Sequence, residues 1–220
     1  KTRGVVEFYI PKFNNKLKYF FEGNQGKTFA LNIGVEESKG EVIAFTDDDV
    51  VVDKNWLKII YDIFKTNPNI ECAAGKVLPI WSSEIPGWYS DKLKSVIGHV
   101  YYGEKQKEVK YCAGANSVFR RSVFEKFGLY DFSNRLEDIF FIRKISKSVK
   151  INYFPELIIH HQVQKARLSK RYFKNWFTEI GNSEGQYKSL PNSKCFLNVD
   201  LWRYREAAGH FVNYFFAPKQ

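Results

Sequence analysis

A short apolar run, Glu41 to Phe45 (EVIAF), stands one residue before three aspartates, Asp47 to Asp49. The run does not alternate between polar and apolar residues, which is typical of a strand buried on both faces of a parallel sheet. In open α/β sheets, ligands bind outside the carboxyl ends of the strands. The sequence therefore favours an α/β fold with a ligand site at the aspartates.

Helical and strand-like segments alternate along most of the chain, as read from the spacing of apolar residues. In chain order we expect a strand at 17–21, a helix at 28–37, a strand at 41–45, a helix after Asp53 with the apolar stripe Trp56, Leu57, Ile60, Ile63 and Phe64, a strand at 70–78, a helix at 120–127, a helix from Glu137 and a strand before Pro155. This order predicts an α/β domain whose sheet is mostly parallel and flanked by helices.

After His161 the chain becomes basic and aromatic. Tyr172, Trp176 and their apolar neighbours recur at helical spacing over 168–180, opposite the basic residues Lys170, Arg171 and Lys174. This pattern predicts an amphipathic helix whose aromatic stripe is buried and whose basic face is exposed. We therefore divide the chain into an α/β domain at 1–165 and a C-terminal helical and aromatic extension at 166–220.

Composition narrows the class of protein and its partners. Hydrophobic residues make up 44% of the 220 residues, which excludes a disordered chain. The net charge of +10 suits polyanionic partners, namely nucleic acid, an anionic membrane or phosphate-bearing substrates. The cysteines and the lack of targeting signals bear on the cellular setting. The three cysteines have no metal-ligand spacing, and the sequence shows neither a signal peptide nor an apolar run long enough to span a membrane. These features favour a reduced, cytoplasmic setting. Because the chain begins at Lys1 and has no Met, we expect it to be incomplete.

Two acidic motifs could carry chemistry. The adjacent carboxylates at 47–49 repel one another, and a hard divalent cation such as Mg²⁺ or Mn²⁺ would supply the counter-charge. The alternative is a polar turn that caps the next helix. The pair Glu137-Asp138 opens a predicted helix, where carboxylates are favourable in any case, but one of them could equally act as a general base.

Two further motifs are open to a structural or a functional interpretation. His160-His161 follows an apolar run, and a neutral imidazole near a carboxylate-bound metal is a common ligand. The small residues of Gly114-Ala115-Asn116 would let a sugar or phosphate approach the backbone, although an ordinary tight turn would look the same.

Together these motifs resemble glycosyltransferase family 2, which has the GT-A (Rossmann-like) fold. The ordered segments are GKTFALNIGV, GEVIAFTDDDV, CAGANSVFRRSVFEKFGLYD, LEDIFFIRK and YFPELIIHH, followed by HQVQKARLSKRYFKNWFTEIGNSEG. The resemblance covers most of residues 17–185. It implies an inverting, metal-dependent transfer of a sugar from a nucleoside-diphosphate sugar to a hydroxyl acceptor on a glycan, a polysaccharide or a lipid.

The resemblance also assigns roles to residues. Asp138 would be the catalytic base with Glu137 supporting it, and Asp49 and His161 would hold Mn²⁺ or Mg²⁺. The donor nucleotide and its diphosphate would be bound by Lys27, Asn32, Asp47, Asp48 and Arg167. The sugar and acceptor pocket would be lined by Gly114, Ala115 and Asn116.

One departure from the family concerns the N-terminus. Family members begin with two strands that hold the nucleotide base, whereas residues 1–13 resemble the helix that follows the second strand. We therefore expect an incomplete base pocket and an open sheet edge. A non-catalytic GT-A-like scaffold and a basic nucleic-acid-binding module are the alternatives, but the second explains neither acidic motif, so we expect no nucleic acid partner. Lipid-linked acceptors and the basic helix lead us to expect peripheral attachment at the inner face of a membrane.

Overall fold

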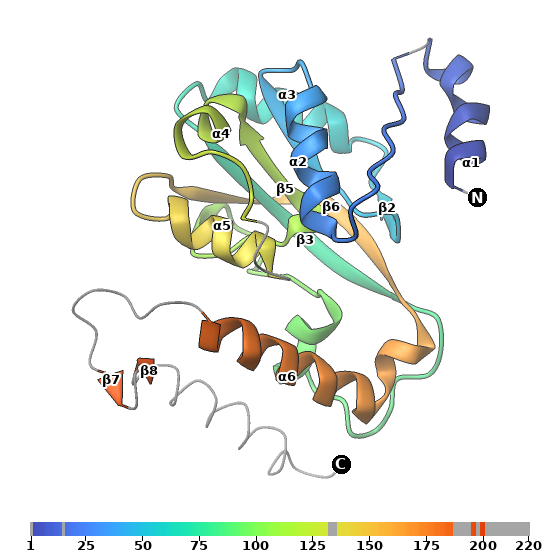
Figure 1. Ribbon diagram of the computed structural model, residues 1–220, viewed down its shortest axis with the longest axis vertical. Coiled ribbons are helices and arrows are strands. Elements are labelled where there is room, and N and C mark those ends of the chain that lie inside the picture. The colour runs from blue at the N-terminus through green and yellow to red at the C-terminus, as the bar shows by residue number, and fades with distance from the viewer. Residues whose placement is uncertain (1, 15, 132–135, 187–194, 197–198, 201–220) are drawn as a thin grey trace.

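The computed structural model describes residues 2–14, 16–131, 136–186, 195–196 and 199–200, and its main element is a six-stranded sheet (Figure 1). The strands run in the order β1-β5-β3-β6-β2, and β4 also pairs with β6. Their bounds are β1 Val42–Phe45, β2 Val50–Val52, β3 Cys72–Trp81, β4 Lys107–Val109, β5 Ser117–Arg120 and β6 Ile151–Val163. A separate two-stranded sheet is formed by β7 (Cys195–Phe196) and β8 (Val199–Asp200).

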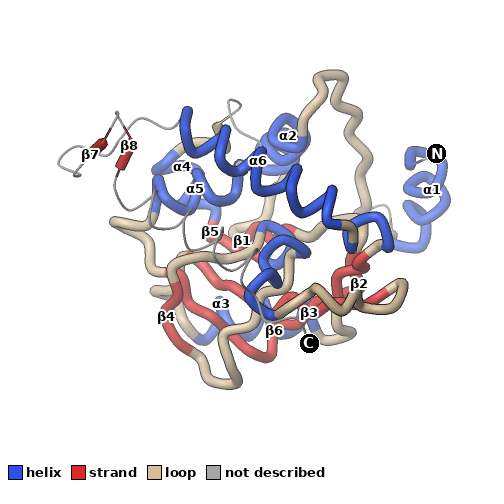
Figure 2. The backbone as a smooth tube through the Cα atoms, turned by 90° about the horizontal axis from the view of Figure 1, so that it is seen from below, coloured by secondary structure: helices blue, strands red, loops and turns tan. Residues whose placement is uncertain are grey.

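Helices cover both faces of the six-stranded sheet, as Figure 2 shows. The described α-helices are α1 Thr2–Tyr9, α2 Lys27–Glu37, α3 Trp56–Thr66, α4 Arg121–Phe127, α5 Glu137–Ile145 and α6 Lys170–Gln186, and the described 3₁₀ helices are η1 Ile10–Phe13, η2 Asp91–Ile97, η3 Gly114–Asn116 and η4 Lys165–Leu168. Successive strand residues face opposite sides of a sheet. Cys72 and Ala74 accordingly join the core formed with α2, α4 and α5, whereas Ala73 joins the core formed with α3.

The predicted α/β class is confirmed, but the prediction of a mostly parallel sheet is wrong. Only the pairing of β3 with β6 is parallel among the ladders of the six-stranded sheet, and all the others are antiparallel. The strands β1, β3 and β6 point the same way, but β5 lies antiparallel between β1 and β3, so only β3 and β6 meet as parallel neighbours.

Three local predictions also need correction. Residues 17–21 form no strand, and Phe21 is 79% exposed, because this apolar run pairs with no strand in the described part of the chain. Leu57 lies on the outer side of α3 and is 71% exposed, so it does not belong to the buried stripe. The strand expected before Pro155 continues to Val163 because a register shift beside Gly75 accommodates the irregularity, so the two histidines lie inside β6.

The amphipathic helix expected near the C-terminus is confirmed as η4 and α6. Leu168 and Phe173 are buried in a cluster with η2 and Val163, and the rings of Trp88 and Phe173 lie 5.0 Å apart. Lys170, Arg171 and Lys174 are exposed, as expected. Most of the remaining extension, from residue 187, lies outside the described residues. Within the described ranges, none of the helices is both long and apolar enough to cross a membrane.

Candidate active site

The acidic triplet lies in the turn that joins β1 to β2, and Lys27 connects it to the first turn of α5. Lys27 begins α2, and its Nζ atom lies 3.0 Å from Asp47 Oδ1 and 3.6 Å from Glu137 Oε1. Burial acts to lower the pKa of Lys27, but the negative charges of Asp47 and Glu137 outweigh it and raise the pKa. A single charged ammonium group therefore joins the two acidic motifs, which are 90 residues apart in the sequence.

The pairing of β2 with β6 places Asp49 beside His161. The ladder pairs Val50 with His161, and Gln162 donates a backbone hydrogen bond to the carbonyl of Asp49 at 2.9 Å. The Nε2 atom of His161 lies 3.3 Å from Asp49 Oδ2. Arg167, on η4, contacts both: its guanidinium lies 2.9 Å from Asp49 Oδ2 and 2.8 Å from His161 Nε2.

This arrangement sets the tautomer of the neutral His161 ring. A guanidinium group can only donate hydrogen bonds, so Nε2 must be the accepting nitrogen and the proton lies on Nδ1. The lone pairs of Nε2 and Asp49 Oδ2 then face each other, and the Arg167 cation bridges them. His161 Nδ1 is buried without a hydrogen-bond partner among the described residues and faces Gly98, where a Cβ atom would lie 3.6 Å away.

Asp49 Oδ2 and His161 Nε2, 3.3 Å apart, are two donor atoms of the kind that a divalent cation takes. Arg167 contacts both atoms, so a cation would have to displace its guanidinium from them. The described residues contain no group of three or more His, Cys, Asp or Glu side chains placed to hold a metal. Further ligands would have to come from water and from a bound anionic molecule, as is usual for Mg²⁺.

Asp138 lies in the first turn of α5, where its carboxylate is held by three donors. The Tyr111 hydroxyl donates to Oδ2 at 3.0 Å, and the backbone N–H of Gly114 donates to the same atom at 3.2 Å. The N–H of Ile139 donates to Oδ1 at 2.8 Å. These three hydrogen bonds fix the orientation of the carboxylate, which a general base also requires.

Glu137 occupies a more enclosed position than Asp138. Its side chain is 7% exposed, and burial raises its pKa, while Lys27 opposes that rise. The ion pair with Lys27 compensates the charge of this buried carboxylate, which would otherwise be costly. Glu137 is therefore held by Lys27 next to Asp138 in the first turn of α5.

Two asparagines that we predicted to bind ligand are instead used within the protein. Asn116 is fully buried; its Oδ1 accepts from the Trp56 indole at 2.9 Å, and its Nδ2 donates to the carbonyls of Lys76 and Leu157 at 2.8 and 3.0 Å. Asn32 exchanges two hydrogen bonds of 3.0 Å with the backbone of Tyr130. Their side chains therefore brace the segments that carry the site and do not line a pocket.

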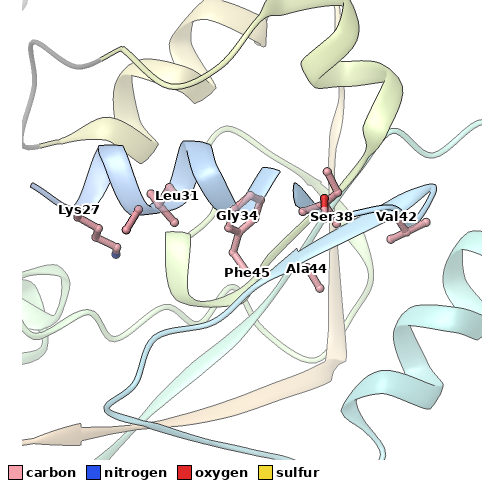
Figure 3. A pocket seen from close by; sticks show the side chains of 9 residues that line it. Lys27, Leu31, Gly34, Ser38, Val42, Ala44 and Phe45 are labelled. Atoms are coloured by element: carbon pink, nitrogen blue, oxygen red, sulfur yellow. The ribbon is translucent and has the colours of Figure 1, made fainter. Parts of the chain in front are cut away.

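The other predicted residues differ in accessibility. Gly114 lies against Asp138, where a Cβ atom would be 3.5 Å from its carboxylate, and Ala115 is buried beside it. Asp48 is exposed in the turn. A groove of about 360 Å³ begins at Lys27 and runs between α2 and the edge strand β1. It is lined by Leu31, Gly34 and Phe45 (Figure 3).

The sequence did not point to two contacts of the site. Tyr111 precedes the predicted pocket segment, but its spacing carries no signal that its hydroxyl reaches Asp138. Arg167 was expected near a diphosphate, whereas its contacts with both Asp49 and His161 depend on the strand register.

Known proteins resemble this chain in sequence and in fold. The family model described as glycosyl transferase family 2 matches residues 1–128. A glucosyl-dolichyl phosphate glucuronosyltransferase of Haloferax volcanii is 30% identical over 110 residues, which are 49% of this chain and 35% of that protein. A poly-β-1,6-N-acetyl-D-glucosamine synthase of Staphylococcus epidermidis is 27% identical over 134 residues, which are 60% of this chain and 32% of that protein.

The crystal structure of GalNAc-T7 with UDP, GalNAc and Mn²⁺ shares the fold. Its TM-score is 0.57 at 17% sequence identity, and the match covers 95% of this chain and 45% of that one. This likeness confirms the GT-A fold. The chain spans less than half the length of each of these three proteins.

Proposed function

Because the chain belongs to glycosyl transferase family 2, we propose that it catalyses an inverting, metal-dependent sugar transfer from a nucleoside-diphosphate sugar to a hydroxyl acceptor. The observation that carries this proposal is the double ion pair of Lys27 with Asp47 and Glu137. This pairing brings Asp47, at the end of β1, next to the carboxylate pair that opens α5, and Asp47 would bind the donor. A transferase needs its donor-binding group and its catalytic base within the length of one sugar.

In the proposed reaction, the Asp138 carboxylate accepts the proton of the acceptor hydroxyl. The acceptor oxygen forms a bond to the anomeric carbon as the bond from that carbon to the diphosphate oxygen breaks. The electron pair of the broken bond leaves with the nucleoside diphosphate. A single displacement from the opposite face inverts the configuration of the anomeric carbon.

The leaving diphosphate gains negative charge as the bond breaks, so positive groups fixed beside it lower the barrier. Arg167, which is 30% exposed and contacts Asp49, would contribute one such charge. Asp49 and His161 would hold Mn²⁺ or Mg²⁺, which supplies Lewis-acid stabilisation of the diphosphate when bound. Asp47 and the exposed Asp48 would contact the nucleotide, and Asn32 would keep α2 in place beside it.

The acceptor is a glycan, a polysaccharide or a lipid-linked sugar. Two of the relatives are named for a dolichyl phosphate substrate and for a poly-N-acetylglucosamine product. The exposed basic residues of α6 would attract an anionic lipid surface, at about 1 kcal/mol per residue. This surface would attach the enzyme peripherally at the cytoplasmic face of a membrane.

Transfer and hydrolysis assays with UDP- and GDP-sugars, with and without Mn²⁺, test the function. We expect release of the nucleoside diphosphate that requires the cation, and NMR of the first product formed should show the opposite anomeric configuration. A retained configuration would refute the single displacement. Specific donor binding without any turnover would favour a non-catalytic scaffold.

A further inference from the structure

We infer that Tyr111 is a positioning residue that holds the Asp138 carboxylate in the orientation needed for proton transfer. The inference rests on the proposed function, in which Asp138 is the base. Tyr111 lies between β4 and η3, and it is absent from the set of residues that the sequence indicated.

The contact is a direct hydrogen bond from the hydroxyl of Tyr111 to Asp138 Oδ2, at 3.0 Å. The backbone N–H of Gly114 donates to the same oxygen from η3, while Ile139 donates to the other oxygen from α5. The carboxylate is thus held from two separate segments of the chain. It cannot rotate about its side-chain bonds without breaking the contacts with Tyr111 and Gly114.

Tyr111 is itself fixed by its neighbours. Its carbonyl accepts a hydrogen bond from the Tyr102 hydroxyl at 3.1 Å, and the ring of Tyr102 packs edge-on against Tyr153 at 5.3 Å. Tyr153 in turn donates to the carbonyl of Gly103 at 3.1 Å. Because Tyr111 is held in this way, its hydroxyl fixes the orientation of the Asp138 carboxylate.

The hydroxyl of Tyr111 also stays protonated at any working pH. Burial raises its pKa well above the ordinary value, and the nearby charge of Asp138 raises it further. The group therefore remains a hydrogen-bond donor. It cannot compete with Asp138 for the acceptor proton.

The matched pair of variants is Tyr111→Phe and Tyr102→Phe. Each removes one hydroxyl from the segments on either side of β4, but only the first removes a donor to Asp138. A shift of a reacting group by about 1 Å can lower the rate about 100-fold. We therefore expect kcat to fall about 10- to 100-fold in Tyr111→Phe. The KM for the donor should stay within about twofold, since binding is not involved. Tyr102→Phe, which removes only a hydrogen bond to the Tyr111 carbonyl and keeps the donor to Asp138, should lower kcat less than Tyr111→Phe does.

A kcat for Tyr111→Phe equal to that of the wild type would overturn the inference. Equal losses in both variants would also overturn it, because they would indicate a general effect on the segments around β4. A loss confined to KM would overturn it as well.

Fluorine NMR of protein labelled with 3-fluorotyrosine tests the contact without activity. The Tyr111 signal is identified by its absence in Tyr111→Phe, and Asp138→Asn should shift it while leaving the Tyr102 signal in place. An unshifted Tyr111 signal would refute the contact. A wild-type protein that binds no donor and transfers no sugar would instead refute the proposed function, so the two failures are distinguishable.

Discussion

Gly75→Ala should be among the most destabilising single substitutions in this protein. A Cβ atom at residue 75 would lie 2.1 Å from Asn116 Nδ2 and 2.2 Å from the carbonyl oxygen of Leu157. Both distances are far below van der Waals contact, and one of the two atoms belongs to the backbone of the central strand β6. The alanine therefore fits only if Asn116 or β6 moves.

The cost follows from what Asn116 does. Its amide makes three buried hydrogen bonds, to Trp56 and to the carbonyls of Lys76 and Leu157. Displacing the amide loses about 1 kcal/mol for each bond, and each buried group left unpaired costs about 1–3 kcal/mol. We expect a loss of about 3–6 kcal/mol, a large part of the roughly 5–15 kcal/mol that stabilises a typical domain.

Urea unfolding followed by circular dichroism measures this loss. Gly34→Ala is the matched control, because a Cβ atom at residue 34 of α2 has nothing within 4 Å and alanine stabilises a helix interior by about 1 kcal/mol relative to glycine. Asn116→Ala removes the same amide without a clash and should cost about 3–6 kcal/mol, because it leaves the same three partners unpaired. A Gly75→Ala protein as stable as the wild type would refute the reasoning, as would a comparable loss in Gly34→Ala.

The remaining predictions concern the site and its surroundings. Asp49→Asn should abolish transfer and the Mn²⁺ dependence of nucleotide binding, which calorimetry measures, while the melting temperature stays near that of the wild type. Undiminished Mn²⁺-dependent binding would exclude Asp49 as a ligand. Asp138→Asn should lower kcat by orders of magnitude with nearly unchanged donor binding, and a loss of that size confined to Glu137→Gln would mean that the two roles are exchanged. The raised pKa of Glu137 means that the folded state binds its proton more tightly than the unfolded state does. The stability of the wild type should therefore fall as the pH rises through that pKa. Glu137→Gln, which does not titrate, should gain more in melting temperature relative to the wild type at about pH 7 than at about pH 4. Lys170→Gln with Lys174→Gln should weaken co-sedimentation with anionic vesicles at low salt, whereas binding that ignores both salt and lipid charge would contradict the electrostatic model.

Local patterns predicted the elements that local forces stabilise. The helices at 28–37, 120–127 and from Glu137 and the strand at 41–45 each correspond to an observed element, because an apolar face or a buried run at that place decides the structure. The segment at 17–21 has the composition of a strand but no strand to pair with in the described part of the chain. Its composition alone could not reveal that.

The site also contains residues that the local sequence indicated and contacts that it could not indicate. The acidic residues stand out because charged groups at a strand end or a helix start are rare without a reason. The hydrogen bonds of Asn32 with Tyr130, of Asn116 with Trp56 and of Tyr111 with Asp138 join residues that only the finished topology brings together. A single sequence could assign the two asparagines to a ligand, but it could not show that the protein itself occupies their amides.

The strand pairing has a consequence for how the protein folds. Each ladder of the six-stranded sheet joins residues at least about 40 positions apart, and the pairing of Val50 with His161 spans the longest stretch of chain. Without hairpins to nucleate the sheet, the entropy of closing long loops must be overcome first, so we expect a high contact order and slow folding. Asp49 and His161 meet only when that longest loop closes. A cation that needs both residues would then hold the finished protein together without accelerating its formation.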